Sequence, residues 1–191
     1  LSNVTGQDTS DSALENRVRA LGSVTLTQPP GATFQYSNAN YETLGLIVQV
    51  VSGRSYEAYV QEHIFAPLDM NNSFLFREQA CEHGAATGYR YWFGLPVPFE
   101  MRYNRGIVPA GLIFSSAEDM AHYLIAHLNG GRYDSTSVLS PTGIAELHRP
   151  AVRTAGGPIV TDEFYAMGWF VREKDGLMTV SHAGSTPNFH A

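Results

Sequence analysis

The sequence contains little cysteine, little lysine and little charge overall. Cys81 is the one cysteine among 191 residues, so the chain cannot form an internal disulfide. Lys174 is the one lysine, and 12 Lys and Arg residues face 18 Asp and Glu residues, which gives a net charge of −6. This composition provides no basic stripe for phosphate contacts. We therefore expect no nucleic-acid partner.

Long apolar runs and metal-binding motifs are also missing. No stretch approaches the roughly 20 apolar residues of a membrane-spanning helix. His122 and His127 are five residues apart, not the four that would place two ligands on one helix face, and Cys81 has no neighbouring zinc ligands. No motif suggests a metal or another cofactor. Hydrophobic residues make up 43% of the chain and charged residues 16%, as in a globular enzyme.

Helical periodicity and capping residues predict four helices, at residues 38–51, 55–65, 117–128 and 140–148. Ser55 and Ser140 are the expected N-caps of the second and fourth, and Gly53 ends the first. The third helix begins after a capping box and presents an apolar stripe that we expect in the core. The stripe consists of Ala117, Met120, Ala121, Leu124, Ile125 and Leu128.

Strand patterns follow in the last part of the chain. Residues 164–172 are aromatic and β-prone, residues 177–182 alternate, and Asp175-Gly176 between them favours a tight hairpin turn. Residues 1–35 and 78–110 are rich in Gly, Pro and polar residues, which is typical of ordered loops. The chain is therefore predicted to be α+β, a helical cluster followed by one β-hairpin.

Two short motifs are candidates for chemistry, Tyr36-Ser37-Asn38 and His182-Ala183-Gly184. A Tyr-x-Asn triplet alone is common, and a tyrosine packed beside an asparagine helix cap would explain it. In their order and spacing, however, the two motifs resemble the second and third signatures of the penicillin-recognising serine hydrolases, which include serine β-lactamases and penicillin-binding proteins.

Longer segments carry the same resemblance. Residues 34–70 resemble the family from the second motif through Ile-Phe-x-Pro-Leu-x-Met, and residues 109–131 resemble its Ala-Gly-Gly-Leu-x-Ser-Thr-Ala-x-Asp-Met helix. The resemblance implies a β-lactamase/transpeptidase-like fold of the class C-like branch. Residues 1–191 would be a partial catalytic domain, mostly helix and loop over 1–155, with the hairpin and the third motif over 156–191.

The resemblance also implies roles for five residues. Tyr36 would share proton transfer, and the Asn38 amide would bind the substrate carbonyl. His182 stands where many members have the lysine of Lys-Thr-Gly, and Gly184 would let substrate approach the strand edge. The backbone N–H of Ser185 would supply half of the oxyanion hole.

The first family signature, Ser-x-x-Lys, is absent. The residue three before Lys174 is Val171, so this motif cannot be drawn anywhere in the chain. We expect the nucleophile to lie outside these 191 residues and the chain alone to be inactive, with a β-lactam, D-alanyl peptide or ester as the substrate of the whole protein. The alternative is a non-catalytic binding or scaffold protein of the same fold. A Ser-His-Asp hydrolase of another fold would need Gly-x-Ser-x-Gly, which the chain lacks.

Two further expectations concern location and association. The resembled family is often exported, which implies a periplasmic, secreted or membrane-anchored protein. In the resembled fold the strand at 177–182 is joined by further strands that the chain does not contain. An edge with unpaired backbone groups beside Met178 and Val180 predicts self-association through the open sheet edge.

Overall fold

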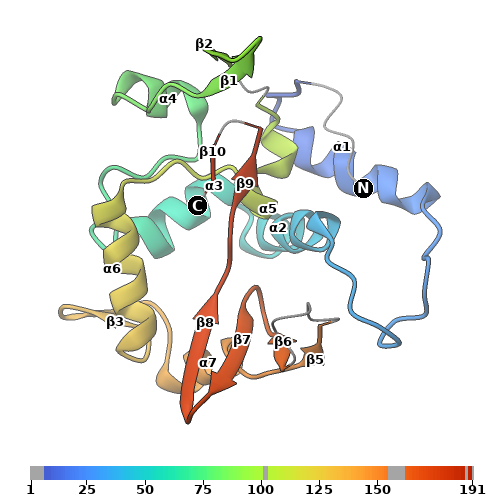
Figure 1. Ribbon diagram of the computed structural model, residues 1–191, viewed down its shortest axis with the longest axis vertical. Coiled ribbons are helices and arrows are strands. Elements are labelled where there is room, and N and C mark those ends of the chain that lie inside the picture. The colour runs from blue at the N-terminus through green and yellow to red at the C-terminus, as the bar shows by residue number, and fades with distance from the viewer. Residues whose placement is uncertain (1–6, 101–102, 155–161, 188, 191) are drawn as a thin grey trace. The chain divides into compact units, whose positions relative to one another are not determined.

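The computed structural model describes residues 7–100, 103–154, 162–187 and 189–190 (Figure 1). The chain forms two compact units, and each unit combines stretches that are distant in sequence. Unit 1 consists of Leu1–Val24, Ser37–Leu124 and Gly184–Ala191, and unit 2 of Thr25–Tyr36 and Ile125–Ala183. The segment 1–6, part of the first region expected to be loop, and the glycines and proline at 156–158 lie outside the described residues.

Unit 1 is mainly helical. Its helices are α1 (Ala13–Ala20), η1 (Leu21–Ser23), α2 (Asn38–Ser52), α3 (Tyr56–Val60), the π-helical turn η2 (Gln61–Phe65), α4 (Arg77–Glu82), η3 (Arg105–Ile107), α5 (Val108–Gly111) and the larger part of α6 (Ala117–Leu128). Two short hairpins accompany them, β1 (Tyr89–Trp92) with β2 (Leu95–Pro98), and β9 (Ser185–Thr186) with β10 (Phe189–His190). Helix α2 packs against α1, α3 and α5.

Three of the four predicted helices form within about one residue of their predicted bounds, whereas the second is α-helical only over Tyr56–Val60 and continues as the π-helical turn η2. Helix α2 ends at Gly53, whose φ of 68° is the left-handed conformation of a helix C-cap. Ser55 and Ser140 cap their helices as expected: their hydroxyls accept hydrogen bonds from the backbone N–H of Ala58 and of Gly143, at 3.2 and 3.1 Å. Local capping chemistry is thus sufficient to fix where these helices begin.

The position of α2 is fixed by close packing and by a buried ion pair. A Cβ added to Gly45 would lie 2.3 Å from Cγ of Pro109 on α5, so only glycine allows this approach. Glu42, which is 1% exposed, accepts a hydrogen bond of 2.8 Å from Arg17 on α1. The helix that begins with the Tyr-x-Asn motif is therefore held on two sides.

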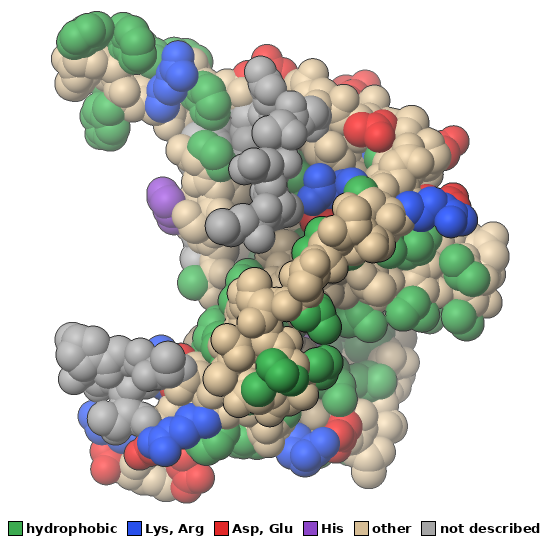
Figure 2. Space-filling model, turned by 90° about the vertical axis from the view of Figure 1, so that its right-hand side faces the viewer, with side chains coloured by type: hydrophobic (Ala, Val, Ile, Leu, Met, Phe, Trp, Pro, Cys, Tyr) green, Lys and Arg blue, Asp and Glu red, His purple; other side chains and the backbone are tan. Residues whose placement is uncertain are grey.

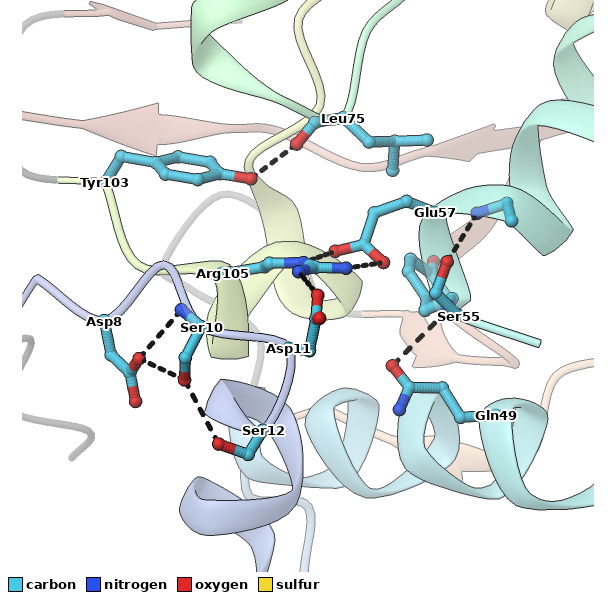
Figure 3. A network of polar contacts seen from close by, with 12 residues as sticks. Asp8, Ser10, Asp11, Ser12, Gln49, Ser55, Glu57, Leu75, Tyr103 and Arg105 are labelled. Carbon is cyan, nitrogen blue, oxygen red and sulfur yellow. Dashed lines mark hydrogen bonds and ion pairs between the residues drawn. The ribbon is translucent and has the colours of Figure 1, made fainter. Parts of the chain in front are cut away.

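A second polar network joins α3, η3 and the segment before α1 (Figure 3). The Arg105 guanidinium donates to both carboxylate oxygens of Glu57, at 2.5 and 3.3 Å, and also pairs with Asp11. Glu57 is 5% exposed and Asp11 almost fully exposed. Nearby, the Tyr103 hydroxyl donates to the backbone oxygen of Leu75 at 2.6 Å. Three stretches of unit 1 thus meet at one arginine.

Unit 2 contains the main sheet of the described residues. Strands β5 (Val152–Arg153), β6 (Glu163–Tyr165), β7 (Phe170–Lys174) and β8 (Leu177–Ser181) form a four-stranded antiparallel sheet in that order. The unit also contains the short hairpin β3 (Arg132–Tyr133) and β4 (Thr136–Ser137), helix α7 (Pro141–Leu147) and the last turn of α6. The predicted turn is confirmed, with Asp175 at φ 54° and Gly176 at φ 76° between β7 and β8.

The sheet is larger than the single expected hairpin, and its first predicted strand is divided. Residues 164–172 belong to β6 and β7, separated by a tight turn in which Gly168 has φ 85° and the Ala166 N–H donates to the Trp169 oxygen at 2.8 Å. Aromatic content alone did not show this break, because the turn residues lie inside a β-prone run.

Two other expectations were wrong. Residues 78–110 contain most of α4, the β1–β2 hairpin, η3 and most of α5, and residues 1–35 contain α1 and η1, instead of loop alone. On α6, all six residues of the predicted core stripe are exposed, whereas Asp119 and Ala126 are buried. Asp119 on the opposite side of the helix is buried, where it accepts hydrogen bonds from the Asn72 N–H at 2.8 Å and from the Ser73 hydroxyl at 2.6 Å within unit 1.

The edge of the main sheet is formed by β8 in the described part of the chain, and its Leu177 and Met178 are exposed. Within the same described ranges, no helix has the length and apolar character needed to cross a bilayer, and no three His, Cys, Asp or Glu side chains gather as a metal site.

Candidate functional site

The second and third motifs meet in an aromatic cluster of unit 2. The ring of Tyr36 lies 5.8 Å from the imidazole of His182, centroid to centroid, and 6.2 Å from the ring of Tyr165. Phe170 of β7 lies 5.5 Å from His182 and 4.9 Å from Tyr165. Two motifs that are far apart in sequence therefore share one packed group of rings, which we call the motif cluster.

Neighbouring strands and one extended segment build the motif cluster. Tyr165 of β6 and Phe170 of β7 are register partners across the sheet, and Phe170 is in turn paired with Ser181, next to His182. Phe34, two residues before Tyr36, places its ring 5.1 Å from that of Tyr165. Ring contacts at these separations are favourable beyond the apolar area that they bury.

The two motif side chains of the cluster remain accessible to a reactant. Tyr36 is 44% exposed and His182 is exposed. The Nδ1 atom of His182 lies 2.8 Å from the backbone oxygen of Ala183, which accepts a hydrogen bond when Nδ1 carries the proton. This tautomer leaves Nε2 as an acceptor. An imidazole and a phenol held together are groups that donate and accept protons in catalysis.

The other three predicted site residues belong to unit 1. Asn38 is the first residue of α2 and is half-buried. Gly184 is exposed and directly precedes β9, and the Ser185 hydroxyl lies 3.0 Å from Nδ1 of His190. The structure thus brings Tyr36 and His182 together within one unit, and the roles of all five residues stay predictions.

Sequence reasoning missed the aromatic partners of the motifs. Phe34, Tyr165 and Phe170 support the Tyr36 and His182 rings, but none of them belongs to a motif. The available signal was the alternation of Phe34 with Tyr36, because alternate residues of an extended segment share a face.

A second group of imidazoles in unit 2 lies apart from these motifs. Nδ1 of His127 is 3.0 Å from Nε2 of His148, and the two rings stack at 5.2 Å, with Trp169 edge-on to both. Burial, and then the neighbouring His148, lower the pKa of His127 to about 4. Burial also lowers the pKa of His148. A hydrogen bond between two imidazoles needs one of them as a neutral acceptor, so this bond excludes a pair in which both rings are charged.

Comparison with known proteins extends over nearly the whole chain. The protein flp of Staphylococcus aureus strain MW2 is 31% identical over 189 residues, which are 95% of this chain and 36% of that protein. The chain therefore spans about a third of the length of this curated relative.

Solved structures are also similar to nearly the whole of this chain, which again covers only part of their length. The octameric penicillin-binding protein homologue from Pyrococcus abyssi superposes with a TM-score of 0.80 at 30% identity, over 95% of this chain and 41% of that one. A penicillin-binding protein from Bacillus halodurans superposes with a TM-score of 0.77 at 25% identity, over 93% and 53%. The fold is that of the β-lactamases and transpeptidases. Residues 2–191 match the Beta-lactamase family, and the chain belongs to this family.

Proposed function

We propose that this chain supplies the Tyr-x-Asn and His-x-Gly parts of an acyl-transfer site that acts on a β-lactam, a D-alanyl peptide or an ester. The observation that carries the proposal is the contact between the rings of Tyr36 and His182, both of which are exposed. Membership of the Beta-lactamase family supports it, because that family includes serine hydrolases.

In the proposed reaction a serine hydroxyl attacks the acyl carbon, and its proton passes to a base. The C–N or C–O bond of the substrate then breaks, and the departing nitrogen or oxygen takes up that proton, which leaves an acyl-serine ester for water to hydrolyse. Tyr36 takes part in that proton transfer, and the Asn38 amide donates to the substrate carbonyl. The Ser185 N–H stabilises the oxyanion, while Gly184 leaves room for the substrate backbone. The serine and its lysine partner come from a Ser-x-x-Lys segment that these 191 residues do not contain.

The first experiment uses the purified chain. We expect it neither to hydrolyse a chromogenic cephalosporin or a nitrophenyl ester nor to be labelled by a fluorescent penicillin, since oxyanion donors and a base without a nucleophile leave only water to attack. Stoichiometric covalent labelling would contradict the location of the nucleophile.

The second experiment uses a longer polypeptide, encoded by the same gene, that contains both this chain and a Ser-x-x-Lys segment. Tyr36→Phe should lower turnover by about 10² to 10⁴, the range for loss of a positioned acid or base, and Asn38→Ala should lower it less. Tyr59→Phe is the matched control, because Tyr59 lies in unit 1 against His63. Unchanged turnover in Tyr36→Phe would overturn the proposal.

The absence of Ser-x-x-Lys also supports a second candidate, a binding or scaffold protein of the same fold. The coding sequence separates the two: a Ser-x-x-Lys upstream of Leu1 favours the enzyme, and its absence there favours the scaffold. From the family we further propose an extracytoplasmic location, which reporter fusions would test.

We also propose self-association through the exposed edge strand β8. The change Met178→Lys places a charge on that edge and should shift light scattering towards the monomer. If light scattering gives the molar mass of a monomer for the unchanged chain at every concentration, this proposal is refuted.

A further inference from the structure

The hairpin of β1 and β2, residues 89–98, exposes large apolar side chains in unit 1. Phe93 is 91% exposed and Tyr91 80%, and Tyr89, Trp92 and Leu95 are also largely exposed. In Figure 2, hydrophobic side chains gather with a basic one at the top, the height at which Figure 1 labels these strands. We call residues 89–98 the aromatic hairpin. Exposed apolar patches of this kind mark interaction surfaces.

The turn of the aromatic hairpin is strained in a way that points to function. Phe93 and Gly94 both have positive φ, 47° and 80°, as in the two-residue turns that favour Asn-Gly. Among the described residues, the other non-glycine residues with positive φ are aspartates, which tolerate that conformation. A phenylalanine at this position is unfavourable because its backbone has positive φ and its apolar ring is exposed to water. Backbone strain of this kind is found mainly at functional sites.

The shape of the apolar surface indicates what covers it. Successive strand residues point to opposite faces, so Tyr91, opposite Pro96, lies on one face, and Trp92, opposite Leu95, lies on the other. Phe93 occupies the tip between them. A flat protein surface would cover one face of this ribbon, whereas a fluid phase would surround both faces and the tip.

Two further features favour a lipid surface over a second protein chain. Proline has no N–H, so β2 offers no donor at Pro96 or Pro98 to an added strand. The hairpin carries one charge, Arg90, whose guanidinium lies 5.5 Å from the Trp92 ring centroid and 4.9 Å from that of Phe99. No acidic residue occurs between Glu82 and Glu100, although the chain has a net charge of −6. The local charge thus complements anionic headgroups.

We propose that the aromatic hairpin docks on the surface of a phospholipid bilayer, with Trp92 and Phe93 in the interfacial layer and Arg90 at the headgroups. Tryptophan and tyrosine rings are enriched at that depth of membranes, and a long basic side chain keeps its charged end in the headgroup layer. The contact is interfacial and does not span the bilayer. It is independent of the proposed acyl-transfer site, because it uses none of the residues to which that site assigns a role.

Vesicle binding by the purified chain tests this proposal. Vesicles of phosphatidylcholine, with and without about 30% phosphatidylglycerol, are floated with the chain at millimolar lipid. We expect the unchanged chain to float, and Trp92→Ser to lower the partition coefficient about tenfold. Arg90→Gln should weaken binding roughly fivefold, and only to the anionic vesicles.

Phe93→Asn is the decisive variant, because asparagine suits the turn better than phenylalanine. It should keep or raise thermal stability while lowering vesicle binding about tenfold. The matched control is Val50→Ser with Val51→Ser, which removes comparably exposed apolar side chains from α2 and should leave binding unchanged. Brominated phosphatidylcholine should quench Trp92, and the Trp92→Phe variant, which retains Trp169, should not be quenched.

Three results would overturn the proposal. One is no flotation of the unchanged chain with either vesicle. Another is equal binding by the unchanged chain and Phe93→Asn. A third is a lipid-free dimer, seen by sedimentation equilibrium, that Phe93→Asn dissociates, since the hairpin would then serve a second copy of the chain.

Discussion

Replacement of Arg105 by leucine should be among the most destabilising changes in unit 1. The substitution removes both hydrogen bonds to Glu57 and leaves a carboxylate that is 5% exposed without its partner. Removing one member of a buried ion pair costs about 3–5 kcal/mol, because the remaining charge keeps its desolvation penalty. A typical domain has only about 5–15 kcal/mol of stability, so the loss would be a large fraction of the total.

The loss of stability in Arg105→Leu depends on the burial of the Glu57 carboxylate. A double-mutant cycle separates the cost of this unpaired charge from the cost of lost packing. We expect Glu57→Leu with Arg105→Leu to cost about 1 kcal/mol or less, because no buried charge is left unpaired. The coupling energy between the two sites would then be about 2–4 kcal/mol plus the cost of Glu57→Leu alone. Asp11→Ala should cost at most about 0.5 kcal/mol, because Asp11 is almost fully exposed.

Urea denaturation followed by far-ultraviolet circular dichroism measures these free energies, and hydrogen exchange on α3 shows whether the loss is local to unit 1. Additive costs in the double variant would refute the reasoning. A cost below about 1 kcal/mol for Arg105→Leu would refute it as well, since solvent would then be screening Glu57.

Other changes test other parts of the chain. His127 has a pKa lowered to about 4 from 6.5, so the unfolded state binds more protons between these pH values, and stability should fall as pH drops from about 6.5 to 4. The upper limit of this loss in stability is about 3 kcal/mol, and we expect roughly half of it because the ring is half-buried. Urea titrations at several pH values should show the loss, and His148→Gln should reduce it. Gly45→Ala should cost about 1–3 kcal/mol by overpacking, whereas Gly22→Ala, with no atom within 4 Å of the added Cβ, should be neutral in the same denaturation assay. Asp119→Ala, which removes the acceptor of the Asn72 N–H and one of two hydrogen-bond partners of the Ser73 hydroxyl, should cost about 1–3 kcal/mol in thermal melts, and an unchanged melting temperature would contradict that estimate.

Much of the helical framework was predictable, because its signals are local. Ser55, Gly53 and Ser140 act at the helix ends where the sequence places them, and the Asp175-Gly176 turn forms where two β-prone runs meet. Capping and turn chemistry involve residues within four positions of one another, so a single sequence contains the whole interaction.

The inward face of α6 was not predictable from periodicity. Asp119 is buried because it accepts hydrogen bonds from residues 72 and 73, which are more than 40 positions away. The motif cluster has the same character, since Tyr165 and Phe170 contact Tyr36 and His182 only through the folded sheet. Resemblance to a family identified the two motif residues but not the rings that support them.

The motif cluster has a kinetic consequence. Its two motif residues are nearly 150 positions apart, and the entropy of closing a loop of that length is about 4 kcal/mol or more. Contacts between such distant residues form late in folding, after the local helices and the β7–β8 turn. The contact between Tyr36 and His182 is therefore expected to be among the last to form, and a fluctuation that opens it need not unfold the helices of unit 1.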